Sequence, residues 1–188
     1  MAKDQQPTQI GATLRKHIAL VGLMGAGKSA IGRRVANAIG ARFLDADREI
    51  EVAAGMTIPD IFETRGEEEF RDGERRVIAR LLEEAPLVLA TGGGAFIDDE
   101  TRGLMLQRAT TIWMRADLDV LVKRCGKRGH RPLLNNGNPR EILAGLMKLR
   151  YPIYAEADIE VYSRDEPHEV AVTEIMRQLK ERGELVIE

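Results

Sequence analysis

A glycine-rich segment that ends in a lysine and a serine lies near the start of the chain. Residues 22–29 read Gly-Leu-Met-Gly-Ala-Gly-Lys-Ser and satisfy the pattern G-x-x-x-x-G-K-[ST]. In such a segment the glycines let backbone N–H groups turn toward a polyphosphate, Lys28 reaches the terminal phosphates, and the Ser29 hydroxyl can ligate Mg²⁺. A chance glycine-rich turn is the alternative, but an apolar run precedes the segment and a helical pattern follows it, as the motif requires. The sequence therefore predicts a binding site for nucleotide phosphates.

Two carboxylates, Asp45 and Asp47, follow the next apolar run. Residues two apart point to the same face of a strand, so we expect both side chains to face one cleft. Two like charges so close are costly unless a cation or hydrogen-bond donors offset them. This arrangement suits one carboxylate near Mg²⁺ and the other on a substrate hydroxyl. The alternative is a strand-end pair that serves as a helix cap and a surface charge.

A second glycine-rich turn, Gly92-Gly93-Gly94, contains no lysine, so it is not a second nucleotide loop. Its glycines permit the close approach of a ligand, and its backbone N–H groups can bind an acceptor substrate. A tight turn required only by packing explains the same residues equally well. Arg71, within a long charged helical stretch, and Arg150 are not distinguishable from surface arginines by pattern alone.

A long break in the helical pattern occupies residues 126–138, where glycines, a proline and paired asparagines interrupt any helix. A loop of this length in a compact domain is often a lid, and a surface excursion is the alternative. The charge of the segment favours a lid, because its basic side chains would be well placed to close over phosphates. These side chains are Lys127, Arg128, His130 and Arg131.

Length and composition limit the possible classes of protein. With 188 residues, of which 44% are hydrophobic and 31% charged, the chain fits one globular domain. No stretch approaches the roughly 18 apolar residues that span a bilayer, so we expect no membrane crossing. The net charge of −2 gives no global field to attract nucleic acid. The single cysteine excludes an intramolecular disulfide and favours a reducing, cytoplasmic location, and the spacing of the histidines gives no case for zinc.

Short apolar runs alternate with helical patterns along the chain, which predicts an α/β fold with parallel strands. Ligands are then expected at the carboxyl ends of the strands. Gly40 closes a first helix, Asn138 and Pro139 open a later one, and Gly183 closes the last. We expect residues 1–16 to form a disordered tail and residues 17–188 a single domain. The predicted strands are 18–21, 42–44, 87–90, 110–114 and 159–162.

The set of motifs resembles shikimate kinase in identity, order and spacing, from about residue 18 to residue 179. The resemblance implies a P-loop kinase fold like that of nucleoside monophosphate kinases, with three α/β/α layers, a five-stranded parallel sheet and a lid. It also implies transfer of the γ-phosphoryl group of ATP to the 3-hydroxyl of shikimate, which gives shikimate 3-phosphate and ADP in aromatic amino-acid (chorismate) biosynthesis. The motifs that carry the resemblance are residues 22–29, Asp45-Ala46-Asp47, Phe70-Arg71, Gly92-Gly93-Gly94, Arg131-Pro132-Leu133 and Arg150.

On the acceptor side, the resemblance implies contacts from Asp47, from two arginines and from the glycine turn. Asp47 would hold hydroxyl groups of shikimate and is a candidate general base. Arg71 and Arg150 would bind its carboxylate, which suits arginine because a guanidinium group pairs with a carboxylate bidentately. The remaining hydroxyl side would meet the backbone of Gly92, Gly93 and Gly94.

On the nucleotide side, the resemblance implies that Lys28 and Arg131 flank the transferred phosphoryl group, with Arg131 delivered by closure of the lid. Ser29 and Asp45 would hold Mg²⁺, with Asp45 acting through water. The further nucleotide contacts implied are Gly25, Ala26, Gly27 and Ala30 in the loop and, on either side of adenine, Arg124 and Pro167.

The sequence leaves two other functions open. A related kinase of gluconate or of a nucleoside monophosphate shares the phosphate loop, but it would not need the set formed by Arg71, Gly93 and Arg150. A regulatory protein would hold ATP without transferring phosphate, and the complete set of expected catalytic side chains argues against it. We therefore expect an ATP-dependent, Mg²⁺-requiring monomer whose partners are shikimate and ATP.

Overall fold

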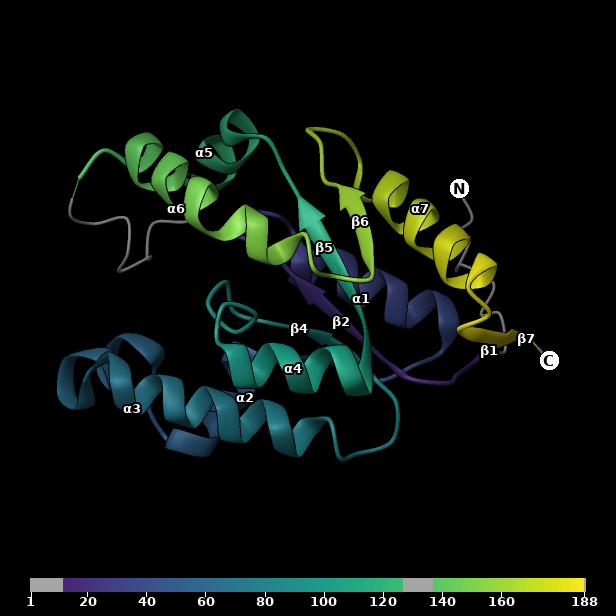
Figure 1. The fold of residues 1–188 in the computed structure, drawn as a ribbon, viewed down its shortest axis with the longest axis horizontal. Helices are drawn as coiled ribbons and strands as arrows, with labels where there is room; N and C mark the ends of the chain where they lie inside the picture. Colours follow the sequence, from purple (N-terminus) through teal and green to yellow (C-terminus); the bar gives the residue numbers. More distant parts are fainter. Residues whose placement is uncertain (1–11, 127–136, 188) are drawn as a thin grey trace, which may run out of the picture.

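A five-stranded parallel sheet forms the centre of the fold (Figure 1). The structure is a computed structural model that describes residues 12–126 and 137–187. The strand order is β3-β4-β2-β5-β6, and every neighbouring pair is parallel. The strands are β2 (His17–Val21), β3 (Phe43–Asp45), β4 (Val88–Ala90), β5 (Ala109–Arg115) and β6 (Ile159–Tyr162). All five predicted strands are therefore confirmed, with ends shifted by one residue at most.

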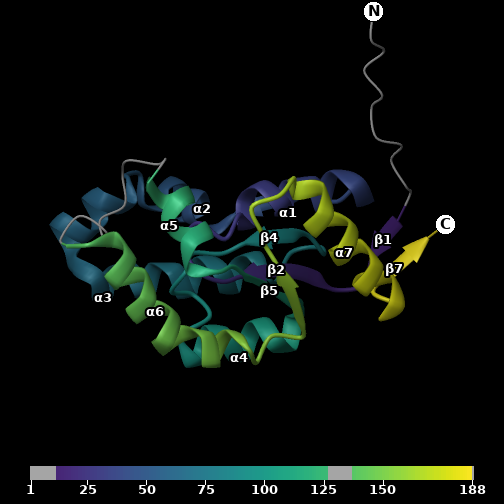
Figure 2. The same cartoon turned by 90° about the horizontal axis from the view of Figure 1, so that it is seen from above.

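Helices cover both faces of this sheet. Figure 2 shows α1 and α7 on one face and α4 and α6 on the other. Because both faces are covered, the central strands are largely buried, and all five residues of β2 are buried. The predicted three-layer α/β/α architecture is confirmed. The helices are α1 (Lys28–Ile39), α2 (Ala46–Ala54), α3 (Ile58–Leu81), α4 (Asp99–Arg108), α5 (Leu118–Gly126), α6 (Pro139–Tyr154) and α7 (His168–Glu181).

The helix ends follow the capping residues in the sequence. Gly40 ends α1 with φ 70° and ψ 20°, and its N–H bonds to carbonyls of the last turn. The Asn138 side chain accepts a hydrogen bond from the Arg140 N–H at 3.0 Å, so Asn138 caps α6 and Pro139 opens it. Gly183, with φ 68°, follows two residues after the end of α7. All three expectations are met.

The first described residues correct one expectation. Strand β1 (Ala12–Leu14) pairs antiparallel with β7 (Leu185–Ile187), with Thr13 opposite Val186. The prediction of a disordered tail reaching residue 16 is therefore wrong for residues 12–14, because a partner strand at the other end of the sequence satisfies their backbone hydrogen bonds. The remainder of that tail, residues 1–11, lies outside the described residues, as do residues 127–136 of the expected lid.

The chain order places one loop at a special point of the sheet. From β2 the chain builds β3 and β4 on one side and then β5 and β6 on the other, so the direction of building reverses at β2. Ligands of open parallel sheets bind outside the carboxyl ends of the strands at such a switch point. The loop that follows β2, residues 22–27, occupies this position.

No helix within the described part of the chain is long and apolar enough to cross a membrane.

Candidate active site

The loop between β2 and α1 surrounds a lysine ammonium group. Gly27 is the N-cap of α1 and has φ 89°, a conformation that favours glycine. No side chain caps α1 and its first turn contains no acidic residue, so the N–H groups and dipole of this turn are available to an anion. Lys28 Nζ donates to the carbonyl oxygens of Gly22 at 2.8 Å and Leu23 at 2.9 Å, inside the curve of the loop. These features form a positively polarised cradle.

A hydroxyl and a carboxylate meet beside this cradle. Ser29, in the first turn of α1, donates from Oγ to Oδ2 of Asp45 at 2.5 Å. Asp45 ends β3, which brings its carboxylate to the start of α1. No group of three or more His, Cys, Asp or Glu side chains in the described ranges could hold a metal alone. Two protein oxygens fit Mg²⁺, because this ion usually keeps several waters and binds one or two protein ligands together with substrate phosphates.

Asp47 reaches the site from a helix and not from a strand. Asp45 caps α2 by accepting the Asp47 N–H at 3.1 Å, and Asp47 lies in the first turn of that helix. The expectation that the two carboxylates share one strand face is thus wrong; the helix-cap alternative holds for Asp45. Asp47 still lies against the glycine turn, because its Oδ1 lies 2.8 Å from where a Cβ atom would stand on Gly92.

The environment of Asp47 favours its protonated form. Although the residue remains accessible to solvent, the pKa of its carboxyl group is raised, first by desolvation within the concave surface and second by the nearby negative charge of Asp45. Lys28 opposes this shift. A carboxylate in such surroundings gains from a cation or from hydroxyl donors of a ligand.

Arg71 is anchored by a buried glutamate. Arg71 Nη1 donates to Glu74 Oε2 at 2.7 Å, and Nη2 donates to Glu67 Oε1 at 3.3 Å. Glu74 is only 2% exposed and its Oε1 has no hydrogen-bond partner among the described residues. Burial raises the pKa of Glu74, and the positive charge of Arg71 opposes the shift. The guanidinium group lies over Gly94, where a Cβ atom would come within 2.7 Å of its Cζ.

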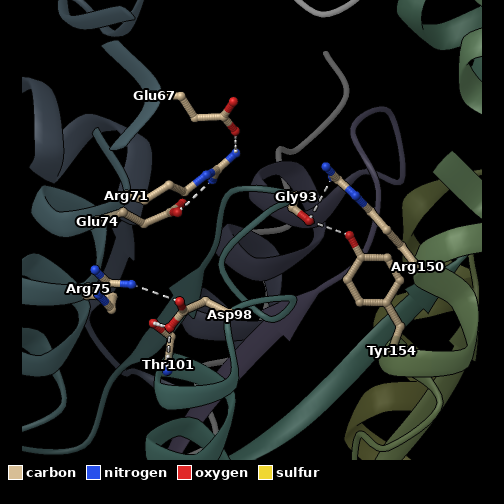
Figure 3. A network of polar contacts seen from close by, with 9 residues as sticks. All are labelled: Glu67, Arg71, Glu74, Arg75, Gly93, Asp98, Thr101, Arg150 and Tyr154. Carbon is tan, nitrogen blue, oxygen red and sulfur yellow. Dashed lines mark hydrogen bonds and ion pairs between the residues drawn. The ribbon is translucent and has the colours of Figure 1, made fainter. Parts of the chain in front are cut away.

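Arg150 reaches the same glycine turn from the opposite side. Arg150 Nη1 donates to the Gly93 carbonyl oxygen at 3.2 Å, and the Tyr154 hydroxyl donates to the same oxygen. Burial raises the pKa of Tyr154 to about 12, so this phenol stays protonated and remains a donor at neutral pH. Figure 3 shows Arg71 on α3 and Arg150 on α6, with Gly93 between them. Two guanidinium groups on either side of an open glycine turn form a site suited to a carboxylate.

Arg124 links the phosphate loop to the segment before α7. Its Nη1 donates to Ser163 Oγ at 2.8 Å and to the Gly25 carbonyl at 3.4 Å. Its Nη2 donates to the carbonyl oxygen of Arg164 at 2.5 Å. Pro167, the N-cap residue of α7, closes the same segment. The two residues expected to enclose adenine are therefore on connected elements next to the loop.

Comparison with known proteins identifies the family of this chain. A family model described as shikimate kinase matches residues 24–180. The chain belongs to the shikimate kinase family. It is similar to the shikimate kinase of Paramagnetospirillum magneticum, with 55% identity over 170 residues that cover 90% of this chain and 87% of the relative. The shikimate kinase of Caulobacter vibrioides is 52% identical over 166 residues, which cover 88% of this chain and 83% of that relative.

A solved structure of a shikimate kinase has the same fold. The enzyme from Acinetobacter baumannii, determined in complex with shikimate, superposes with a TM-score of 0.86 and 36% sequence identity. The match covers 94% of this chain and 96% of the other. The predicted P-loop kinase fold and the predicted family are thereby confirmed.

In this shikimate kinase family member, the expected site residues gather at the carboxyl ends of the strands, apart from Arg131, which lies outside the described residues.

Sequence reasoning missed Glu74 and Tyr154. Within its charged helical stretch nothing but spacing distinguishes Glu74, which follows Arg71 by three residues and so shares its face. Tyr154 follows Arg150 by four residues and shares its face in the same way. This spacing was the available signal.

Proposed function

We propose that the cleft between α2, α3 and α6 binds shikimate and that the loop of residues 22–29 presents the γ-phosphoryl group of ATP to its 3-hydroxyl. Membership of the shikimate kinase family makes the chain an ATP-dependent kinase that acts on a hydroxyl group of shikimate. The products are shikimate 3-phosphate and ADP, in the pathway to aromatic amino acids. The step therefore requires a phosphate cradle and a polyhydroxylated carboxylate site side by side.

The acceptor assignment rests on one observation. Arg71 and Arg150 each contact one of two adjacent glycines. Arg71 lies over Gly94, and Arg150 bonds to the carbonyl of Gly93. Each guanidinium group keeps further N–H donors, and two such groups can hold the single carboxylate of shikimate. The backbone of Gly92, Gly93 and Gly94 would then line the hydroxyl side of the ring.

For Asp47 we propose contact with the shikimate hydroxyls. A hydroxyl donor, together with the positive charges of Lys28 and Arg71, would stabilise its carboxylate, whose pKa is raised in the free protein. It can also accept the proton of the attacking hydroxyl. Phosphoryl transfer through a loose transition state depends more on positioning and electrostatics than on proton removal, so the positioning role comes first.

On the donor side, we assign the transferred phosphoryl group to Lys28 and to the N–H groups of the loop. The nucleotide-binding set is Gly25, Ala26, Gly27, Lys28, Ser29 and Ala30, with Arg124 and Pro167 on the two sides of adenine. Mg²⁺, when bound, neutralises charge on the phosphates. Ser29 and Asp45 are the residues that would hold it, because their oxygens already meet at the start of α1. The role of Arg131 as a lid residue over the phosphoryl group rests on the family resemblance.

The metal assignment predicts a specific change in Mg²⁺ dependence. Asp45→Asn keeps an oxygen beside Ser29 but removes the charge, so we expect the Mg²⁺ concentration for half-maximal activity to rise at least tenfold, as for a lost ionic partner worth about 1.4 kcal/mol or more. Asp99→Asn, at a carboxylate with 92% side-chain exposure, serves as the control. An unchanged Mg²⁺ requirement in Asp45→Asn would remove Asp45 from the metal site.

A substrate panel tests the proposed acceptor. We expect ADP release with shikimate, and none above background with gluconate or a nucleoside monophosphate. Comparable turnover on gluconate or on a nucleotide, with none on shikimate, would overturn the acceptor assignment. Tight ATP binding without ADP release on any acceptor would instead favour a regulatory nucleotide-binding protein.

We further propose that the protein acts as a cytoplasmic monomer with one domain, which includes β1 as well as residues 17–188 and has a lid at about residues 126–138. The single cysteine, buried at 4% exposure, suits a reducing compartment. Light scattering across a concentration series tests the monomer, and fractionation of the source cells tests the location. Cleavage by a protease within residues 126–138, slowed by ATP and shikimate together, is the result expected of a lid.

A further inference from the structure

A groove of about 350 Å³ lies between α2 and α3. Its floor is apolar and is made by Ile50, Ile61, Phe70 and Val77, which are 3%, 4%, 5% and 8% exposed. The two halves of α3 meet at an angle because Gly66 has φ 83° and ψ 173°, so both halves line the groove. The volume falls within the range of pockets that hold small organic molecules.

Arginines surround this apolar floor. Arg65 pairs with Glu69 at 3.1 Å, and Arg80 lies 3.6 Å from Glu49. Arg76 also lines the groove, and within residues 12–126 and 137–187 no carboxylate lies within ion-pair distance of it. An anion in the groove would therefore find one guanidinium group without an ion-pair partner, whereas Glu69, a carboxylate that lines the groove, is paired with Arg65.

A glycine in the middle of α3 keeps the groove open. Gly73 lines it, and a Cβ atom on Gly73 would have no neighbour within 4 Å. Glycine is less favourable than alanine inside a helix, and here no neighbouring atom requires it. The missing side chain leaves space directly beside Phe70 and Val77.

The groove is separate from the acceptor site. Residues of an α-helix are about 100° apart around its axis, so Arg76 and Arg80 project from α3 on the side opposite Arg71 and Glu74. Arg71 bonds to Glu67, and both Arg71 and Glu74 lie against the glycine turn, whereas the groove residues of α3 face α2. Phe70 is the link between the two, since it lines the groove and precedes Arg71.

We propose that this groove is a second binding site, for a small amphipathic organic anion with a compact apolar ring and one carboxylate. The ring lies on Phe70 and Val77 in the space left by Gly73, and the carboxylate bonds to the guanidinium group of Arg76. Both the ring and the charge of the ligand are needed. An anion without a ring would leave the apolar floor exposed to water. A neutral ring would leave Arg76 without a counter-charge.

Calorimetric titration of the full chain with benzoate as the probe tests this site. The protein is first saturated with shikimate and ADP, which occupies the acceptor carboxylate site. We expect one site for benzoate, with benzamide and acetate at least tenfold weaker. Arg150→Ala, in the acceptor site, keeps the benzoate affinity within twofold when the shikimate concentration is raised to saturate this variant as well. The test measures binding, so its result is independent of which acceptor the kinase phosphorylates.

Matched variants locate the site. Gly73→Leu fills the groove and Arg76→Gln removes its charge, and each weakens benzoate binding at least tenfold. Gly73→Ala adds one methyl group in open space and raises the melting temperature while largely retaining binding. Arg48→Gln, at an exposed arginine of α2 outside the groove, is the charge control and stays within twofold. Absence of benzoate binding, or equal binding by Gly73→Leu and the unaltered chain, overturns the proposal.

Discussion

Arg71 and Glu74 form an ion pair of 2.7 Å in which the side chain of the acid is 3% exposed and that of the base is 24% exposed. The carboxylate therefore lies beneath the guanidinium group, and the guanidinium group lies at the wall of the cleft. A flexible arginine loses less conformational freedom on binding a ligand when a partner already fixes its orientation. The pair thus prepares Arg71 for a carboxylate.

Loss of either cleft arginine should weaken shikimate binding selectively. We expect Arg71→Ala or Arg150→Ala to cost about 1.5–3 kcal/mol, or roughly ten- to a hundredfold in Kd, because a charge-assisted hydrogen bond is lost. The affinity for ATP stays nearly unchanged. Arg75→Gln is the control, since Arg75 lies on the same helix but pairs with Asp98 at 2.9 Å (Figure 3). Calorimetric titration measures both ligands, and equal loss for ATP would refute the assigned role.

Replacement of Glu74 by glutamine should affect shikimate binding through Arg71. Glutamine keeps the shape and one acceptor oxygen but loses the charge that holds the guanidinium group. We expect the KM for shikimate to rise about two- to tenfold, the range of one hydrogen bond, with a smaller change in the KM for ATP. Glu74→Leu removes the acceptor as well and has the larger effect. A lower melting temperature with an unaltered KM for shikimate would mean that Glu74 serves packing alone.

Asp47→Asn should separate stability from activity. The pKa of Asp47 is raised, so the folded chain holds this proton more tightly than the unfolded chain does. Its contribution to stability is complete at low pH and is lost as the pH rises through the folded pKa. We expect Asp47→Asn to have a slightly higher melting temperature at neutral pH, a difference that disappears in acid, together with a large loss of kcat. The stability gain is small because the residue is accessible to solvent. A lower melting temperature for Asp47→Asn at neutral pH would contradict the raised pKa of Asp47.

His17 should make the fold sensitive to acid. This residue is 5% exposed at the start of β2, and its Nδ1 accepts the Leu87 N–H at 3.3 Å. Its pKa is lowered, chiefly because burial disfavours the imidazolium form. The unfolded chain takes up this proton near pH 6.5, so stability is complete above that pH and falls as the pH drops through 6.5 toward the folded pKa.

His17→Asn provides the comparison, since its Oδ1 can accept the same N–H without titrating. Melting temperatures between about pH 8 and pH 5 should fall less steeply for this variant than for the unaltered chain. Parallel curves for the two proteins would show that another group controls the acid sensitivity.

The sequence alone predicts the parts of the site that depend on residues adjacent in the chain. Residues 22–29 form the phosphate loop because strand, glycines and helix are contiguous. The helical placement of Asp47 was missed because Asp45 can end a strand and cap a helix equally well, and only the backbone after it decides. Burial of Glu74 depends on α3 packing beside the glycine turn, a contact between distant segments. The pairing of β1 with β7 is also long-range, and three-residue strands have no periodicity to reveal them.

The β1–β7 pair has a practical consequence for handling the molecule. Thr13 and Val186 lie opposite each other on this small sheet, and β1 leads directly into the amino end of β2 (Figure 1). The phosphate loop and the glycine turn follow the carboxyl ends of β2 and β4, at the other pole. A surface anchor or a pair of dyes attached at β1 and β7 would therefore leave the cleft facing the solution. Immobilised enzyme and single-molecule recordings can both use this end as the point of attachment.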